Sequence, residues 1–283
     1  LFTLSIFLLD IWFEIPGTRT YGTDTAGQGV FHHHIAEGMV LAFLGACALQ
    51  RALQASERPS YRAFWLLICL TVLAGIFSVG QSRTGQLNVL VAYVLVLATH
   101  LPRQYRLRAL GLSLLAAFLL VLASPKVQER FAQGLRETAT FQQDGERTSV
   151  GARLKAWEFS FESIKQALWL GHGVGSYREL AHQHFRASRI CDLGVCEQPH
   201  NQFIVTAFEM GIIGLVALFA LILTGLFHRP DSLSTASRLL PAFMAIFTLT
   251  ALMDSSLKIQ AQSFFTVTCL GLLLAAKVLD EKK

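Results

Sequence analysis

The sequence predicts an all-α fold, a polytopic integral membrane helix bundle with a large outer loop that contains amphipathic helices. Of its 283 residues, 53% are hydrophobic and only 15% are charged, whereas soluble domains carry about 25% charged residues. The apolar residues gather into runs that approach the roughly 20 residues needed to cross a bilayer. Such runs must be helical, because a backbone amide left unpaired in lipid costs too much free energy.

The apolar runs predict up to eight membrane helices. One run at 1–13 starts at Leu1, without an initiator Met or a basic segment, so we expect the end of a truncated helix rather than a signal peptide. The others are 35–49, 63–79, 87–99, 110–123, 203–227, 239–253 and 259–276. This divides the chain into transmembrane helices over 1–123, a soluble-looking loop over 124–201 and three C-terminal transmembrane helices over 202–283.

The positions of the cations predict the orientation, because short loops rich in Lys and Arg stay in the cytoplasm. If the helices alternate in direction, four groups of cations fall on one side: Arg51, Arg58 and Arg62; Arg103, Arg106 and Arg108; Arg229 and Arg238; Lys277, Lys282 and Lys283. The segment 124–201 then faces outward, and its seven arginines are not explained by this rule. The four groups of cations on the cytoplasmic side account for much of the basic balance, so the net charge of +5 gives no reason to expect a nucleic-acid partner.

The outer loop has two stretches with helical periodicity. Residues 127–135 predict a short amphipathic helix. Residues 153–169 place Leu154, Trp157, Phe161, Ile164 and Leu168 on one face, which is typical of a helix on the membrane surface or packed on the bundle. The glycine-rich turn at 171–177 resembles a nucleotide-binding loop only weakly, since no strand precedes it. We expect its glycines to bend the backbone and bring Tyr177 and Arg178 near the bilayer.

Two of the five cysteines, Cys191 and Cys196, lie in the outer loop. In an oxidising compartment this pair can form a disulfide. A metal site would need further ligands, and the nearby histidines complete no recognised zinc pattern, so no metal or other cofactor is predicted.

Five motifs stand in a fixed order over about 31–225: Ser82-Arg83-Thr84-Gly85, Arg153 with Trp157, Leu170-Gly171-His172-Gly173-Val174-Gly175-Ser176-Tyr177, Pro199-His200-Asn201-Gln202-Phe203 and Glu209-Met210-Gly211-Ile212-Ile213-Gly214. Through this set of motifs the chain resembles the O-antigen ligase and O-antigen polymerase superfamily of bacterial cell envelopes, and most of all an O-antigen ligase.

The resemblance implies an enzyme of the bacterial inner membrane with its active site in a periplasmic loop. Such a glycosyltransferase moves glycan from undecaprenyl diphosphate to the lipid A core oligosaccharide without a nucleotide sugar or an essential metal. Its partners would be the lipid-linked donor, the lipid A core acceptor and membrane lipids. The resemblance also implies that four or five helices precede Leu1.

The chemistry of this transfer suggests roles for particular residues. A departing diphosphate gains negative charge, which guanidinium groups stabilise through bidentate hydrogen bonds, so Arg83, Arg130 and Arg153 are the candidate donor-binding residues. The acceptor hydroxyl needs a base that can be neutral near pH 7, and His200 is the candidate. We expect His200 and Arg153 to be catalytic. The candidate supporting residues are His34, Tyr177, Arg178 and Asn201.

Each assignment has a structural alternative. Arg83 can be an interfacial residue at a helix end, Arg130 a solvated one, and Arg153 a helix cap or the partner of Glu158; His200 can simply begin a helix. Within the same chemistry, a polymerase or a protein O-oligosaccharyltransferase is the alternative activity. A different class, a non-catalytic lipid or polysaccharide transporter, would be expected to show repeated halves and polar sites at mid-membrane, and the sequence shows neither.

The predicted orientation can be tested by cysteine labelling in a background without the native free thiols. Glu57→Cys and Gln104→Cys should react only with a reagent that reaches the cytoplasm, whereas Gln143→Cys should react with an impermeant reagent from outside. Labelling of position 104 from outside would overturn the orientation.

Overall fold

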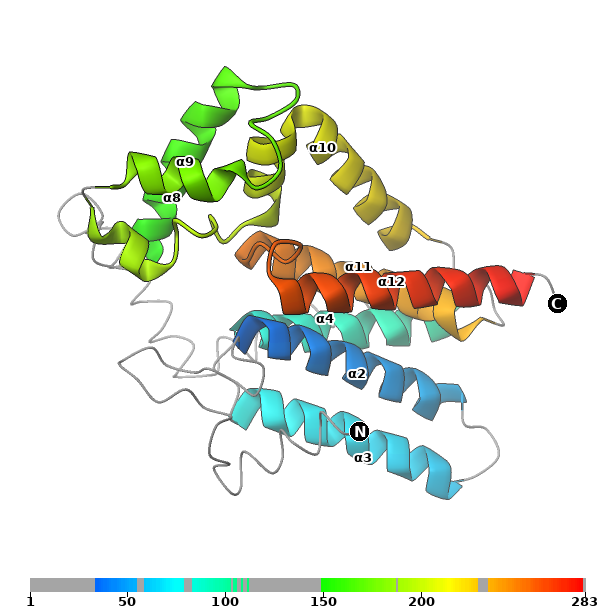
Figure 1. Cartoon of the computed structure of the whole chain (residues 1–283). Coiled ribbons are helices and arrows are strands. Elements are labelled where there is room, and N and C mark those ends of the chain that lie inside the picture. The colour runs from blue at the N-terminus through cyan, green and yellow to red at the C-terminus, as the bar shows by residue number, and fades with distance from the viewer. Residues whose placement is uncertain are drawn as a thin grey trace. The chain divides into compact units, whose positions relative to one another are not determined.

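The computed structural model describes residues 34–54, 59–78, 83–102, 104, 105, 108, 111, 149–186, 188–228 and 234–281. Over these residues every regular element is helical (Figure 1). The helices are α2 (His34–Gln54), α3 (Pro59–Ser78), α4 (Arg83–His100), α8 (Ser149–Gln166), α9 (Ser176–His184), the 3-10 helix η1 (Arg189–Leu193), α10 (Gln202–Leu226), α11 (Thr235–Met253) and α12 (Gln260–Glu281). The predicted segments 1–13 and 127–135, and nearly all of 110–123, lie outside the described residues.

Four of these helices are long and apolar enough to cross a membrane. They include the stretches Ile35–Gln54, Pro59–Phe77, Gln202–Leu226 and Thr235–Met253, and shorter apolar helices cover Thr84–His100 and Gln262–Ala276. The predicted fold class, an all-α polytopic membrane protein, is therefore confirmed.

The chain forms two compact units. The bundle unit contains α2, α3, α4, α12 and α11 up to Thr250. The loop unit contains α8, α9, η1, α10 up to Ile222, and the link 251–258 that follows α11.

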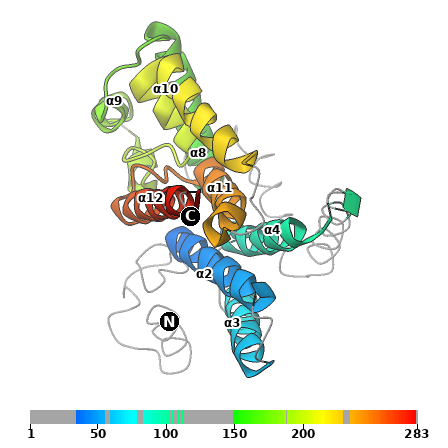
Figure 2. The ribbon, with the colours of Figure 1, turned by 90° about the vertical axis from the view of Figure 1, so that its right-hand side faces the viewer.

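Helix α2 lies at the centre of the bundle unit, among α3, α4 and α12 (Figure 2). Close contact is possible because Gly45 has no side chain: a Cβ there would lie 2.5 Å from the Tyr93 hydroxyl oxygen. That hydroxyl donates to the Cys69 carbonyl over 3.1 Å, which links α4 to α3. On another face of α2, the ring of Phe43 packs edge-on against Phe243 of α11, with 4.9 Å between centroids.

A polar cluster joins one end of α2, α4 and α11. His100 contacts Gln50 Oε1 through Nε2 at 2.9 Å and Arg238 through Nδ1 at 2.9 Å. Because arginine only donates, Nδ1 of His100 accepts and Nε2 donates to Gln50. The helix ends next to the predicted cytoplasmic cations Arg51 and Arg238 thus lie together, in agreement with their placement on one side of the membrane.

The loop unit has its own buried core, which contains Tyr177 and Phe208. Ala152 and Ala156 of α8 are fully buried in this core. Of the predicted stripe of large side chains, Ile164 packs against the core and Phe161 is 52% exposed.

Helix α10 is broken at Gly211, where the sequence predicted one continuous helix over 203–227. Gly211 has φ 65° and ψ −163°, which is not helical. In an unbroken helix the Ile212 and Ile213 amides would donate to the Phe208 and Glu209 carbonyls. Here the glycine-rich turn replaces both bonds. His172 and Gly173 amides donate to the two carbonyls, each at 2.9 Å, and the two isoleucine amides donate to Leu168 and Trp169 carbonyls at 2.9 and 3.5 Å.

Two glycines allow the backbones to meet at this crossing. A Cβ on Gly171 would lie 2.4 Å from the Glu209 carbonyl carbon, and one on Gly211 would lie 2.2 Å from the Trp169 carbonyl oxygen. Both glycines also have positive φ, which other residues adopt only with strain. Gly171 and Gly211 come from two separate sequence motifs, and both allow the same close contact between backbones.

We predict that Gly171→Ala disrupts this crossing, because the added methyl group would collide with backbone that cannot move aside. Gly173→Ala is the matched control: Gly173 has φ 98°, but nothing lies within 4 Å of its Cβ position. The control should show only backbone strain, roughly 1–3 kcal/mol. Thermal unfolding in detergent and proteolysis of the outer loop measure the difference. Equal stability of the two variants would contradict the steric role of Gly171.

Candidate functional site

The candidate site is centred on His200, in the connection between η1 and α10. His200 has φ 53°, and it is the only non-glycine residue with positive φ in the described part of the chain. Such a backbone persists where its neighbours fix it, and it is found often at functional sites. The preceding residue is held by the Trp157 indole, whose N–H donates to the Pro199 carbonyl over 2.7 Å.

Asn201 fixes the other side of His200. Its side-chain oxygen accepts from the amides of Phe203 and Ile204 at 3.0 and 3.1 Å, so it is the N-cap of α10. Its side-chain nitrogen donates to the Leu252 carbonyl over 3.1 Å. Asn201 therefore starts the helix and also fastens the link 251–258 beside it.

The link brings a carboxylate to the histidine. His200 Nδ1 lies 3.2 Å from Asp254 Oδ1; the Asp254 side chain is fully buried, and that of His200 is 15% exposed. The same Asp254 oxygen accepts from the Ser255 amide over 3.0 Å. A carboxylate only accepts, so Nδ1 of His200 carries the proton of this bond and Nε2 of the neutral ring keeps its lone pair. The pair can therefore present an oriented base.

Two further contacts fix the link to α10. Gln202 Oε1 accepts from the Leu257 amide over 2.7 Å. Lys258 Nζ donates to Glu209 Oε1 over 2.7 Å and lies 5.3 Å from the centre of the Tyr177 ring. Because Glu209 is at the glycine crossing, the link that carries Asp254 is anchored to the same segment of α10 that receives the turn.

Tyr177 is part of the core rather than of an open surface. It is fully buried, and its hydroxyl donates to the Val195 carbonyl over 2.8 Å. Burial raises the pKa of this phenol, so it stays a neutral donor. This places Tyr177 beneath Lys258 as a structural support.

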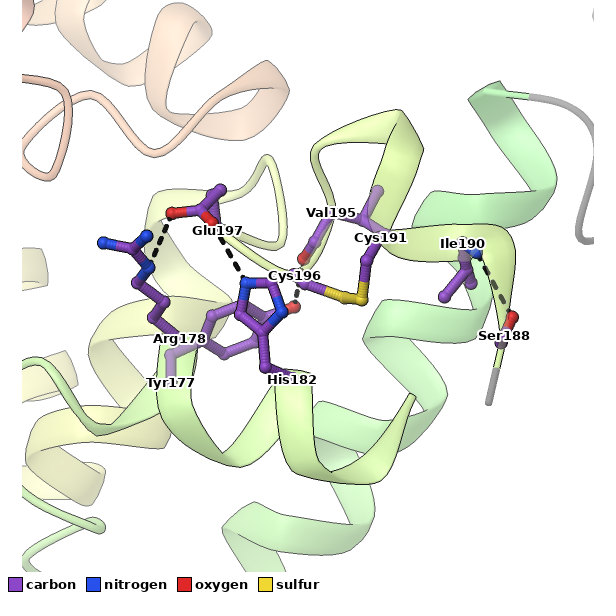
Figure 3. The surroundings of a disulfide bond; sticks show 9 residues. All are labelled: Tyr177, Arg178, His182, Ser188, Ile190, Cys191, Val195, Cys196 and Glu197. Atoms are coloured by element: carbon purple, nitrogen blue, oxygen red, sulfur yellow. Dashed lines mark hydrogen bonds and ion pairs between the residues drawn. A yellow bond between two sulfur atoms is a disulfide. The ribbon is translucent and has the colours of Figure 1, made fainter. Parts of the chain in front are cut away.

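Val195 lies between Cys191 and Cys196, which are joined by a disulfide bond (Figure 3). On the same side of the loop unit, Glu197 accepts from Arg178 at 2.9 Å and lies 3.0 Å from His182 Nε2. Figure 3 shows both side chains pointing toward the Glu197 carboxylate. Arg178 is thus occupied by an exposed ion pair in this arrangement.

Arg153 is half-buried on α8, one helical turn before Trp157. Residues four apart lie on the same face of a helix, so Arg153 shares a face with the residue that holds Pro199. Arg83 and His34 begin α4 and α2 in the bundle unit, and their side chains lie outside the described residues, as does the whole of Arg130.

Sequence reasoning missed Asp254, which falls between the predicted helices 239–253 and 259–276. The available signal was an acidic residue directly after the apolar run 239–253, since a carboxylate at the edge of the membrane is a functional candidate. Nothing in the sequence pairs it with His200, because 54 residues separate the two.

Comparison with known proteins agrees with the motifs. The family profile described as O-antigen ligase matches residues 64–219, more than half of the chain. A curated protein of Haemophilus influenzae, described as uncharacterized, is 23% identical over 209 residues, which are 71% of this chain and 52% of that protein. The chain thus spans about half the length of this relative. By the extent of the profile match, the chain belongs to the O-antigen ligase family.

Proposed function

We propose that the protein is a glycosyltransferase that moves O-antigen glycan from undecaprenyl diphosphate to the lipid A core oligosaccharide, at the periplasmic face of the inner membrane. The observation that carries the proposal is the pairing of His200 with the buried Asp254 carboxylate over 3.2 Å. The membership of the family supports the reaction type and a lipid-linked polysaccharide donor.

In the proposed step a hydroxyl oxygen of the acceptor attacks the anomeric carbon of the donor sugar. His200 Nε2 takes the hydroxyl proton as the new C–O bond forms. The bond between the anomeric carbon and the diphosphate oxygen breaks on the opposite side, so the configuration inverts and undecaprenyl diphosphate leaves with the electron pair. The proton, the electrons and the leaving group are thereby accounted for.

Asp254 is a positioning residue in this scheme. Its bond to Nδ1 selects the ring tautomer with a free Nε2 and stabilises the imidazolium as it forms. The strained backbone of His200, held between the Trp157 contact and the Asn201 cap, fixes the direction of the ring.

Arginines are the proposed partners of the diphosphate. Their planar guanidinium groups can bind phosphate oxygens bidentately and offset the charge that develops on departure, without a metal ion. Arg153 is the candidate with a described position, on the α8 face that also carries Trp157. Arg83 and Arg130 are proposed from the motif chemistry alone.

The acceptor distinguishes this proposal from its alternatives. The full-length protein is incubated with lipid-linked glycan and, in separate reactions, with lipid A core, a second lipid-linked glycan or an acceptor protein. Transfer only to the lipid A core supports a ligase. Transfer to either other acceptor identifies a polymerase or a protein O-oligosaccharyltransferase, and the absence of all transfer with retained donor binding favours a transporter.

We predict that His200→Ala lowers the transfer rate about 10²- to 10⁴-fold, the usual contribution of a general base, while donor affinity is retained. Asp254→Asn should lower the rate in the same direction with unchanged donor affinity, and Asp254→Glu should recover part of it. His182→Ala is the matched control, because His182 is another outer histidine paired with a carboxylate. Rate and donor affinity are measured separately. Weak donor binding with a normal rate for bound donor would make His200 a binding residue instead.

For the donor site, Arg153→Ala should abolish transfer and weaken donor binding while expression is normal. Arg153→Lys should recover little, because lysine lacks the planar fork. Arg186→Ala serves as the control, since Arg186 is an exposed arginine of the same loop. Binding of lipid-linked glycan to the purified protein is the measurement, and full affinity in Arg153→Ala would remove Arg153 from the site.

A further inference from the structure

Three large apolar side chains in and directly before the glycine-rich turn are exposed. Trp169, Leu170 and Val174 are 67%, 74% and 82% exposed within the described part of the chain, and we refer to them as the apolar tip. Their exposure is not a general property of this unit, which buries Tyr177, Ile190 and Phe208 completely. Exposed apolar side chains gathered on one short segment commonly mark a surface that meets a membrane or another molecule.

The apolar tip is attached to a membrane helix. The carbonyls of Leu168 and Trp169 accept from the amides of Ile212 and Ile213, just past the break in α10. From this point α10 also presents apolar side chains outward, with Met210, Ile213 and Val216 all exposed. The exposed apolar surface of α10 therefore begins where the tip is attached.

The length of α10 sets the depth of this point. Helix α10 ends at Leu226, and the sequence turns polar at His228 and Arg229. A stretch of roughly 20 residues, the length that crosses the hydrocarbon core, that ends at Leu226 begins at Ala207. The crossing at Gly211 thus falls within the outer part of the core, where the tip would lie beside acyl chains.

The break in α10 supports the same depth for the crossing in the bilayer. Ile212 to Leu226 rises about 22 Å at 1.5 Å per residue, which is less than the roughly 30 Å of hydrocarbon. The part of α10 before Gly211 cannot supply the missing surface, because its Val205 and Phe208 are buried against the loop unit. At the level of the crossing, the exposed side chains of Trp169 and Leu170 supply apolar surface.

We infer that the apolar tip is inserted among the acyl chains of phospholipids in the outer leaflet and holds the loop unit at the bilayer surface. Phospholipid is the occupant that fits, because the tip continues the lipid-exposed side of α10, and tryptophan is enriched at membrane interfaces. This inference does not depend on the proposed transfer reaction.

The test uses the full-length protein in phospholipid nanodiscs with a nitroxide attached to Val174→Cys. Oxygen concentrates in hydrocarbon and a water-soluble nickel complex in the aqueous phase, so the label should be relaxed mainly by oxygen. The matched control is Gln183→Cys on α9, an exposed polar position of the same unit, which should be relaxed mainly by nickel. Nanodiscs with brominated acyl chains should, in addition, quench a fluorescence component that Trp169→Phe removes.

Equal nickel access at 174 and 183 would overturn the inference. So would protection of position 174 from both reagents, which would mean that another protein segment covers the tip. Oxygen access or quenching that appears only after addition of polyprenyl diphosphate would also overturn it, because the tip would then bind the donor chain. All these measurements are made without turnover, so failure of the proposed function leaves their outcome unaffected.

Discussion

The loop unit depends on an exchange of backbone hydrogen bonds between the glycine-rich turn and α10. A helix that breaks inside an apolar environment leaves amides and carbonyls unpaired, and each such group is costly to bury. Here the turn supplies donors and acceptors to the residues on both sides of Gly211. The break is thus compensated only while the two backbones stay in contact, and the absence of side chains at Gly171 and Gly211 permits that contact.

The candidate site is built outward from the same region. Glu209 is at the crossing and binds Lys258, the last residue of the link; Gln202 binds Leu257 just before it, and Asn201 binds Leu252 near the start of the link. Three residues of α10 and its cap therefore determine where Asp254 lies. The Asp254 carboxylate is thereby held in place beside His200. A buried carboxylate held in this way stabilises a neighbouring imidazolium more than an exposed carboxylate can.

Composition and the lengths of the apolar runs predicted the membrane fold, because lipid leaves few alternatives to the helix. The motifs also led to His200 and Asn201, whose local roles depend on their neighbours in sequence. The pairing with Asp254 could not be predicted, because it depends on how α11 ends beside α10. The break at Gly211 was missed for a similar reason: an isolated glycine in an apolar run does not reveal that a distant turn replaces its helical bonds.

The glycine crossing allows the segment between its two ends to vary in length. The backbone leaves the crossing after Gly173 and returns to it at Phe208, so everything between forms a lobe whose two ends meet. Residues added or lost within the lobe would change its outline without shifting the register of the membrane helices. The lobe also includes His200, so its remaining surface can vary while the pairing of His200 with Asp254 stays tied to α10. A membrane bundle of this design can keep one site and exchange the surface around it.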